Sequence, residues 1–561
     1  MNDMIEQAKK EVREIILGAV GAAVAAQKLP AEPMPDFTIE IPNDSAHGDF
    51  SCNAALVSAK AFRSNPRAIA QTIADNAVLA GTVFDKIEVA GPGFINFFVS
   101  SRWFGETVSA VLENGADYGK VNVGKGKRVL VEFVSANPTG PMHIGNARGG
   151  AIGDCLSSLL EYAGYYVERE FYINDAGNQV NKFGLSLDYR YRQHFGDDIE
   201  MPEDSYHGQD IIDHAEKFAE IYGDKYMHDT EENRRAALVA YALPINIQGL
   251  KDDLAKYRIH YNTWFRESTL HESGRVKEIV EILKEKGHTY EKDGAVWFKA
   301  SEFGDDQDRV LVRANGVPTY FVPDIAYHYN KLVTRNFDIA IDILGADHHG
   351  YIARMKAALT ALGIDPNRLD VVIMQMVRLV RNGETVKLSK RSGKAITLAT
   401  LLDEIPMDAA RFFFNLRDPD THLEFDLDLA IEESSKNPVF YVQYAHARIC
   451  RILERMKEDG IERKELPAGE LIYTEPAELA LVRKLASLPQ EITEAAKAYN
   501  PSVITRYVQE LAQLFHKFYD TCKIKGEEEK ILRSRLALCE AVKTVFRNML
   551  NLLKVDAPEK M

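Results

Sequence analysis

The chain has 561 residues and is poor in cysteine. Its five cysteines form no CxxC pair and no close cluster, which excludes a disulfide framework and a cysteine-ligated zinc site. Scattered thiols are typical of a reducing cytosol, so we expect a cytoplasmic protein. The positions concerned are Cys52, Cys155, Cys450, Cys522 and Cys539.

Long apolar runs are also lacking. No stretch reaches the roughly 18–20 apolar residues that a membrane-spanning helix needs. The nearest candidate, residues 15–26, follows a start that contains Glu6, Glu11 and Glu14, unlike the basic start of a secretory signal. We therefore expect a soluble protein with no membrane partner.

Positive charge is in deficit, because 68 Lys and Arg face 83 Asp and Glu, a net charge of −15. An acidic chain can bind a polyanion only through local basic surfaces. With 46% hydrophobic and 27% charged residues, the composition is that of a folded protein without long disorder. At about 150 residues per domain, the length predicts three or four domains.

Patterning divides the chain into three domains. Residues 1–115 mix helical and strand patterns and predict an α+β domain. Residues 125–415 follow an α/β pattern, and residues 430–561 have helical periodicity alone. The predicted fold is therefore α/β: a Rossmann-type parallel-sheet core with an α+β N-terminal domain and an all-α C-terminal domain.

The central domain opens with a βαβ unit. A buried strand at 129–134, a helix at 144–163 and a strand at 167–173 have the spacing of a parallel sheet. The charged interval of about 190–300 predicts a mostly helical insertion. The α/β pattern then resumes, with expected strands at 320–322, 339–345 and 371–380.

The run His143-Ile144-Gly145-Asn146 lies between the expected strand at 129–134 and the helix at 144–163, at the start of that helix. Unpaired N–H groups and the positive end of a helix dipole make such a start a phosphate site. A capped helix with a structural histidine is an equally good reading of these four residues alone.

A second run, Lys387-Leu388-Ser389-Lys390-Arg391, follows the expected strand at 371–380. Its cations suit a triphosphate whose charge must be neutralised during reaction. A solvated basic loop is the better reading of this run alone, but the two runs in this order support each other.

Together, His-Ile-Gly-Asn and Lys-Leu-Ser-Lys resemble the HIGH and KMSK motifs of class I aminoacyl-tRNA synthetases. Val131-Glu132-Phe133, with Asn137 before the first motif, resembles arginyl-tRNA synthetases of the bacterial type. The resemblance covers essentially the whole chain, including an N-terminal domain and a helical anticodon-binding domain. It departs from the family motif at Asn146, since asparagine can donate a hydrogen bond but cannot carry a proton.

The resemblance implies ATP-dependent ligation of L-arginine to its cognate tRNA through an arginyl-adenylate, with Mg²⁺ as cofactor. It implies catalytic roles for His143, Asn146, Lys387 and Lys390. It implies ATP contacts from Gly145, Ser389, Arg391 and His348. We expect the enzyme to act as a monomer.

A planar cation with five donors favours carboxylates with an aromatic neighbour. Glu132, Asn137, His143, Tyr320 and Asp324 match the arginine-binding positions of the family in spacing. The alternatives are a structural ion pair for Glu132 and a helix cap for Asp324.

Phe94 and Asn96 are predicted tRNA contacts by stacking and hydrogen bonding, with strand packing an equally good alternative. The run Asp347-His348-His349 predicts no metal site, because adjacent side chains rarely point the same way.

Two other functions compete with this interpretation. Another class I ligase or a small nucleotidyltransferase would share the phosphate site, but a small nucleotidyltransferase would not explain the flanking domains. A non-catalytic RNA-binding protein would be marked by a damaged active site, and the retained His143, Lys387 and Lys390 argue against it.

Overall fold

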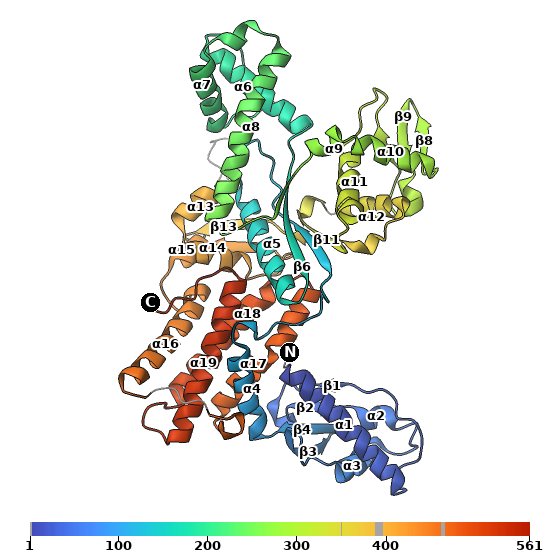
Figure 1. Ribbon diagram of the computed structural model, residues 1–561, viewed down its shortest axis with the longest axis vertical. Helices are drawn as coiled ribbons and strands as arrows, with labels where there is room; N and C mark the ends of the chain where they lie inside the picture. Colours follow the sequence, from blue (N-terminus) through green and yellow to red (C-terminus); the bar gives the residue numbers. More distant parts are fainter. Residues whose placement is uncertain (1–2, 349, 387–395, 462–465) are drawn as a thin grey trace.

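The computed structural model describes residues 3–348, 350–386, 396–461 and 466–561. The second predicted motif, with Lys387, Ser389, Lys390 and Arg391, lies outside the described residues. Figure 1 shows the α+β domain at one end, a helical projection at the other, and the C-terminal helices packed between the α+β domain and the central sheet.

The N-terminal domain is an antiparallel sheet of order β1-β2-β4-β3 with three helices. Its predicted strand–turn–strand is the β3–β4 pair, in which Ala90 faces Phe94 across the turn. The bounds are α1 Met4–Ala25, β1 Ile39–Glu40, β2 Phe50–Cys52, α2 Ala54–Ser58, α3 Pro66–Asn76, β3 Phe84–Ala90 and β4 Phe94–Val99.

The central domain carries the predicted parallel sheet, with five strands in the order β12-β11-β5-β6-β7. Every neighbouring pair is parallel. The Rossmann-type prediction is therefore confirmed. The bounds are β5 Arg128–Glu132, α5 Ile144–Tyr162, β6 Tyr166–Ile173, β7 Thr263–Arg266, α11 Phe321–Tyr329, β11 Ile339–Gly345, α12 Tyr351–Leu362 and β12 Leu369–Met374.

The interval 190–300 is only partly a helical insertion. Three helices project from the core, but the chain then returns to the sheet as β7, where Trp264 stacks on Phe171 of β6 at 4.6 Å between ring centroids. A three-stranded antiparallel sheet follows. Charged neighbours hid these short aromatic strands from the sequence pattern. The bounds are α6 Asn178–His194, α7 Gln209–Tyr222, α8 Glu231–Lys256, α9 Ser268–Glu272, α10 Arg275–Glu285, β8 Thr289–Lys292, β9 Ala295–Phe298 and β10 Arg309–Val312.

Two strand predictions need correction. Residues 320–322 are not a strand: they open helix α11, where Pro323 is tolerated because the first helical turn needs no N–H donors. The expected strand at 371–380 is two strands, which separate at Gln375, where the backbone N–H bonds to Pro419. The second of them belongs to a separate three-stranded sheet. The bounds are β13 Val377–Arg381, β14 Glu384–Thr385, α13 Leu398–Glu404, α14 Met407–Phe414, β15 Leu423–Asp426 and α15 Leu427–Ile431.

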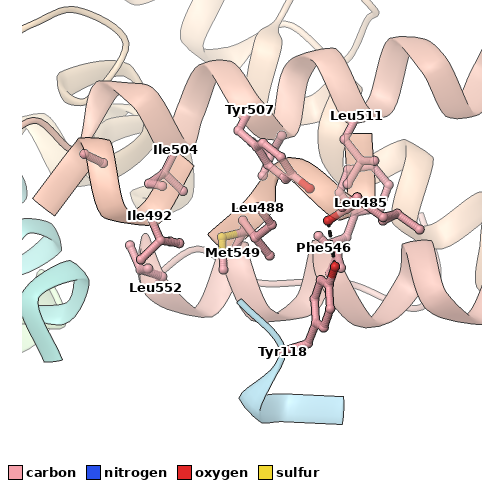
Figure 2. Packing of buried hydrophobic residues seen from close by; sticks show 14 of the residues in the cluster. Tyr118, Leu485, Leu488, Ile492, Ile504, Tyr507, Leu511, Phe546, Met549 and Leu552 are labelled. Carbon is pink, nitrogen blue, oxygen red and sulfur yellow. Dashed lines mark hydrogen bonds between the residues drawn. The ribbon is translucent and has the colours of Figure 1, made fainter. Parts of the chain in front are cut away.

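The C-terminal domain is helical, as predicted, and forms α16 Pro438–Glu458, α17 Pro476–Lys497, α18 Ser502–Thr521 and α19 Glu529–Leu552. Helix α4, Ser101–Asn114, leads from the N-terminal domain onto these helices. Beyond it Tyr118 enters their core, where its hydroxyl donates to the Leu485 carbonyl at 2.9 Å (Figure 2). None of the described helices combines the length and apolar character that crossing a bilayer requires.

A buried arginine joins the C-terminal domain to the central one. Arg411 on α14 is fully buried and bonds to Asp154 of α5 at 2.6 Å, the Tyr257 carbonyl at 2.8 Å and the Leu553 carbonyl at 3.2 Å. One guanidinium thus links α5, the end of α8 and the end of α19. Because the site is dry, this contact costs much more to break than a surface ion pair.

We predict that Arg411→Met lowers the free energy of unfolding by about 3 kcal/mol, since Asp154 loses its fully buried partner and keeps only the contact with Arg169 at 3.2 Å. Arg417→Met, at an exposed position nearby, is the matched control and should change stability by less than about 0.5 kcal/mol. Urea unfolding followed by fluorescence measures both. Equal midpoints for the two variants would contradict this role of Arg411.

Candidate active site

A pocket of about 760 Å³ opens at the carboxyl ends of β5, β11 and β12, beside the start of α5. The sheet runs from β5 to β6 and β7 on one side and to β11 and β12 on the other, so its winding reverses here. Ligands of open α/β sheets bind at such a reversal. Five predicted site residues line the pocket: Glu132, Gly145, Asn146, Asp324 and His348.

The N-terminus of α5 forms one wall of the pocket. His143 is the N-cap, and its backbone N–H donates to Oδ1 of Asn146 at 3.1 Å. Asn146 therefore caps the helix from its third position, a role that any side-chain acceptor can fill. Because Gly145 and Gly149 have no side chains, the helix backbone itself lines this wall. The positive end of the helix dipole faces the pocket.

Strained backbone follows β5. Val134 and Ser135 have φ values of 69° and 41°, which are unusual for residues with a side chain and costly for a β-branched one. The bend brings Ser135 Oγ within 2.8 Å of Glu132 Oε1, to which it donates, and within 3.1 Å of the Tyr172 N–H, from which it accepts. The strained bend thus places Ser135 so that its hydrogen bond holds Oε1 of Glu132 in position.

A buried lysine holds the other oxygen. Lys331 Nζ lies 2.5 Å from Glu132 Oε2 and 2.8 Å from Asp342 Oδ1, and its side chain is fully buried. Burial opposes its charge, but Asp342 and Glu132 outweigh burial and raise the pKa of Lys331. Burial likewise opposes the charge of Asp342, yet Lys331 and His328 lower the pKa of its carboxyl. Lys331 and Asp342 are therefore both charged.

His328 completes this network. Its Nδ1 lies 2.8 Å from the carbonyl of Asp324, and its Nε2 lies 2.7 Å from Asp342 Oδ2. Both neighbours are acceptors, so only the imidazolium, which has two N–H donors, satisfies both contacts. The floor of the pocket therefore holds two cations, Lys331 and His328, against two anions, Glu132 and Asp342.

Asp324 differs from the other carboxylates of the pocket. Among the described residues its side chain has no hydrogen-bond partner. Burial raises its pKa to about 7, with Glu267 and Glu132 adding to the rise while His328 opposes it. An unpartnered acid with this pKa gains most from a cationic ligand.

The inward-facing polar residues of α11 and of the turn that follows it were not predicted. Tyr327 donates to Glu170 at 2.6 Å, and Arg335 pairs with Glu168 at 2.6 Å and with Glu170 at 2.5 Å. Together with His328 and Lys331 they follow Asp324 at helical spacing and face the sheet. This inward polar stripe was a readable signal, but the mistaken strand at 320–322 concealed it.

Arg148 is another residue that sequence reasoning missed. Buried within α5, it donates to the Gln375 carbonyl at 2.6 Å and to the carbonyls of Asp418 and Thr421 at 3.1 and 3.0 Å. Gln375 lines the pocket beside Met374, so Arg148 fixes that wall against the helix. Burial lowers its pKa to about 10, and it remains charged at neutral pH.

Other predicted residues lie outside the pocket lining. Asn137, His143 and Tyr320 are exposed, and the Tyr320 hydroxyl accepts from the backbone N–H of Asn178 at 3.2 Å. On the N-terminal sheet Phe94 is 40% exposed, whereas Asn96 is buried and its Oδ1 accepts from Ser51 at 2.8 Å. Of these two, Phe94 alone offers its side chain to a partner.

Within the described ranges, no three His, Cys, Asp or Glu side chains are grouped to hold a metal. Asp347 and His348 lie at the exposed rim of the pocket, 3.6 Å apart. Any divalent cation here would therefore share its coordination with a ligand such as a polyphosphate.

Comparison with known families agrees with this geometry. Residues 107–449 match the catalytic domain of class I (R) tRNA synthetases, so the central domain is a class I synthetase core. Residues 7–99 match the arginyl-tRNA synthetase N-terminal domain, and residues 442–561 match the DALR anticodon-binding domain. The chain belongs to the arginyl-tRNA synthetase family.

Individual relatives span the full length. The arginine–tRNA ligase of Caldanaerobacter subterraneus is 54% identical over 562 residues, and that of Acetivibrio thermocellus is 50% identical over 564, with all of each chain covered. The Thermus thermophilus arginyl-tRNA synthetase structure has a TM-score of 0.72 at 21% identity, covering 97% of this chain and 99% of that one. This likeness supports the fold.

The cap at Asn146 gives a stability prediction. Asn146→Ala removes the acceptor for the His143 N–H and should lower the free energy of unfolding by about 1 kcal/mol. Asn146→Asp retains an acceptor at a favourable helix position and should cost little. Urea midpoints compare the two variants. If alanine and aspartate behave alike, the side-chain cap contributes nothing.

Proposed function

We propose that this protein catalyses the ATP-dependent ligation of L-arginine to tRNA(Arg). The observation that carries the proposal is that one pocket has a bare helix N-terminus on one wall and, on another, a carboxylate, Asp324, with no partner among the described residues. The first suits phosphate and the second suits a guanidinium. We propose a monomer that works with Mg²⁺.

In the first step a carboxylate oxygen of arginine attacks the α-phosphate of ATP, and pyrophosphate leaves as arginyl-adenylate forms. Gly145 and Asn146 would hold phosphate from the start of α5, with His143 as a second contact. Lys387 and Lys390 would neutralise charge on the leaving group, and Ser389, Arg391 and His348 would contact ATP. Mg²⁺ bound to the phosphates would supply further neutralisation.

The guanidinium of arginine would bind between Asp324 and Glu132. Asp324 supplies an uncompensated negative charge, and Glu132 is an oriented acceptor whose oxygens keep lone pairs beyond their contacts with Lys331 and Ser135. Asn137 and Tyr320 remain predicted contacts to the same substrate.

In the second step a hydroxyl of the terminal ribose of tRNA attacks the arginyl carbonyl, and AMP leaves. The helical C-terminal domain would bind the anticodon arm. Phe94 would stack on a nucleotide base from the N-terminal sheet, and Asn96, on the same strand face, remains a predicted hydrogen-bonding contact to it.

The test is aminoacylation of tRNA with ATP, Mg²⁺ and all standard amino acids, the esterified residue being identified by mass. We expect arginine alone. Transfer of another amino acid would overturn the pocket assignment and retain the class I chemistry. Folded protein that gives no product with tRNA from its own source would favour the non-catalytic RNA-binding alternative.

Arginine use should depend on pH through Asp324, whose pKa is about 7. Below that pH the carboxyl is protonated and offers no charge to the guanidinium, so kcat/KM for arginine should fall about tenfold per pH unit. Above it the profile should be flat. Steady-state kinetics from pH 5.5 to 8.5 measure this fall, which is the acidic limb of the pH profile.

Asp324→Asn is the control for that measurement. It should lower kcat/KM for arginine at pH 8 and remove the acidic limb, while the KM for ATP changes little. Equal effects on the arginine and ATP KM values would place Asp324 outside the amino-acid site.

A further inference from the structure

The pocket contains more carboxylates than one substrate cation can neutralise. Four acidic residues line it: Glu132, Asp324, Asp342 and Asp347. Asp347 is exposed at the rim beside His348, where solvent screens its charge. The other three surround the inner part of the pocket, so an empty site would hold three anions without internal cations.

Lys331 supplies an internal cation at this position. It leaves α11 in a π-helical turn, Asn330–Thr334, an irregularity that recurs at functional sites. Its ammonium contacts both Glu132 and Asp342 and also lies 4.1 Å from the centre of the Tyr327 ring. No part of the Lys331 side chain reaches the surface, so water and salt do not weaken these contacts.

We propose that Lys331 is a positioning residue that sets the charge of the arginine site. Lys331 contacts Glu132 and Asp342, and His328 is the second cation on Asp342. Together they leave Asp324 as the one inner carboxylate without a cationic contact among the described residues, so the pocket offers one negative charge to the one positive charge of the substrate side chain. This inference rests on the proposed arginine site.

The charge balance follows from the neighbours of Asp324 on every side. Tyr172 of β6 and Tyr351 of α12 are neutral, because burial raises the pKa of both phenols and Asp324 adds to the rise. His328 and Lys331 face it from its own helix and the turn that follows. Glu132 faces it from β5, and Glu267 from the residue before α9. The two cations lower its pKa and the two anions raise it, so a change in either group moves the pH at which Asp324 becomes charged.

Two variants should shift the acidic limb in opposite directions. Lys331→Met removes the cation of Glu132 and leaves Asp342 with His328 alone, so Asp324 should hold its proton to higher pH, by about one unit. Asp342→Asn leaves the cations in excess, so the limb should move to lower pH by a similar amount. If the substitutions only destabilised the pocket, the acidic limb would stay at the same pH in both variants. Shifts in opposite directions are specific to a change in charge.

Arg335→Met is the matched control. Arg335 lies one turn beyond Lys331 on the same stripe and pairs with Glu168 and Glu170, but it contacts neither Glu132 nor Asp342. The variant loses two ion pairs, as Lys331→Met does, at a partly buried position. The pH midpoint of its limb should stay within about 0.3 units of the original value, a shift well below that expected for a direct charge neighbour.

The measurement is kcat/KM for arginine against pH for all these variants, with circular dichroism to establish folding. Opposite shifts for Lys331→Met and Asp342→Asn, with none for Arg335→Met, support the proposal. Unshifted or equally shifted limbs overturn it. Should Lys331→Met fail to fold, the downward shift of Asp342→Asn decides alone. If Asp324→Asn leaves the limb intact, the arginine site itself is misplaced, which is a separate failure.

Discussion

One buried ammonium joins the elements that meet at the pocket. Lys331 comes from the turn after α11, Glu132 from the end of β5 and Asp342 from the middle of β11. β5 and β11 are the two strands between which the winding of the sheet reverses, so the ion pairs hold the site together at its topological centre. Removing either partner of such a pair exposes the other to an apolar surrounding, which is why the three groups depend on one another.

Close packing and buried polar contacts also hold helix α5, on the opposite wall of the pocket. Small residues let α5 approach the sheet so closely that a Cβ atom on Gly153 would lie 2.2 Å from the Phe133 side chain. Arg148 and Asp154 then fix α5 to the strand junction at Gln375 and to Arg411. The start of α5 beside the pocket is thus held in place by contacts in the middle of the helix.

The sequence predicted what local pattern determines. The βαβ unit, the helix start at His143 and the pocket position of Glu132 followed from hydrophobic runs and motif spacing. Asp324 does line the pocket, but it was proposed beside an expected strand that is the start of a helix. The ion network did not, because its partners are far apart: Glu132 and Lys331 are separated by 199 residues. Reading residues 320–322 as a strand also hid the stripe from Asp324 to Arg335, which lies on helix α11 and the turn that follows it.

Asp324 shows why an active site departs from the rules that hold elsewhere in the fold. Buried acids are stabilised by partners, and Glu132, Asp342, Glu170 and Asp154 all have them. Asp324 has none among the described residues, and its raised pKa records the cost of burial that a partner would otherwise offset. In the proposed arginine site, a substrate cation would recover that free energy on binding, whereas a neutral amino acid would not. The stability given up at one carboxylate would thus become preference for a positively charged side chain, and a planar guanidinium would also meet the fixed oxygens of Glu132.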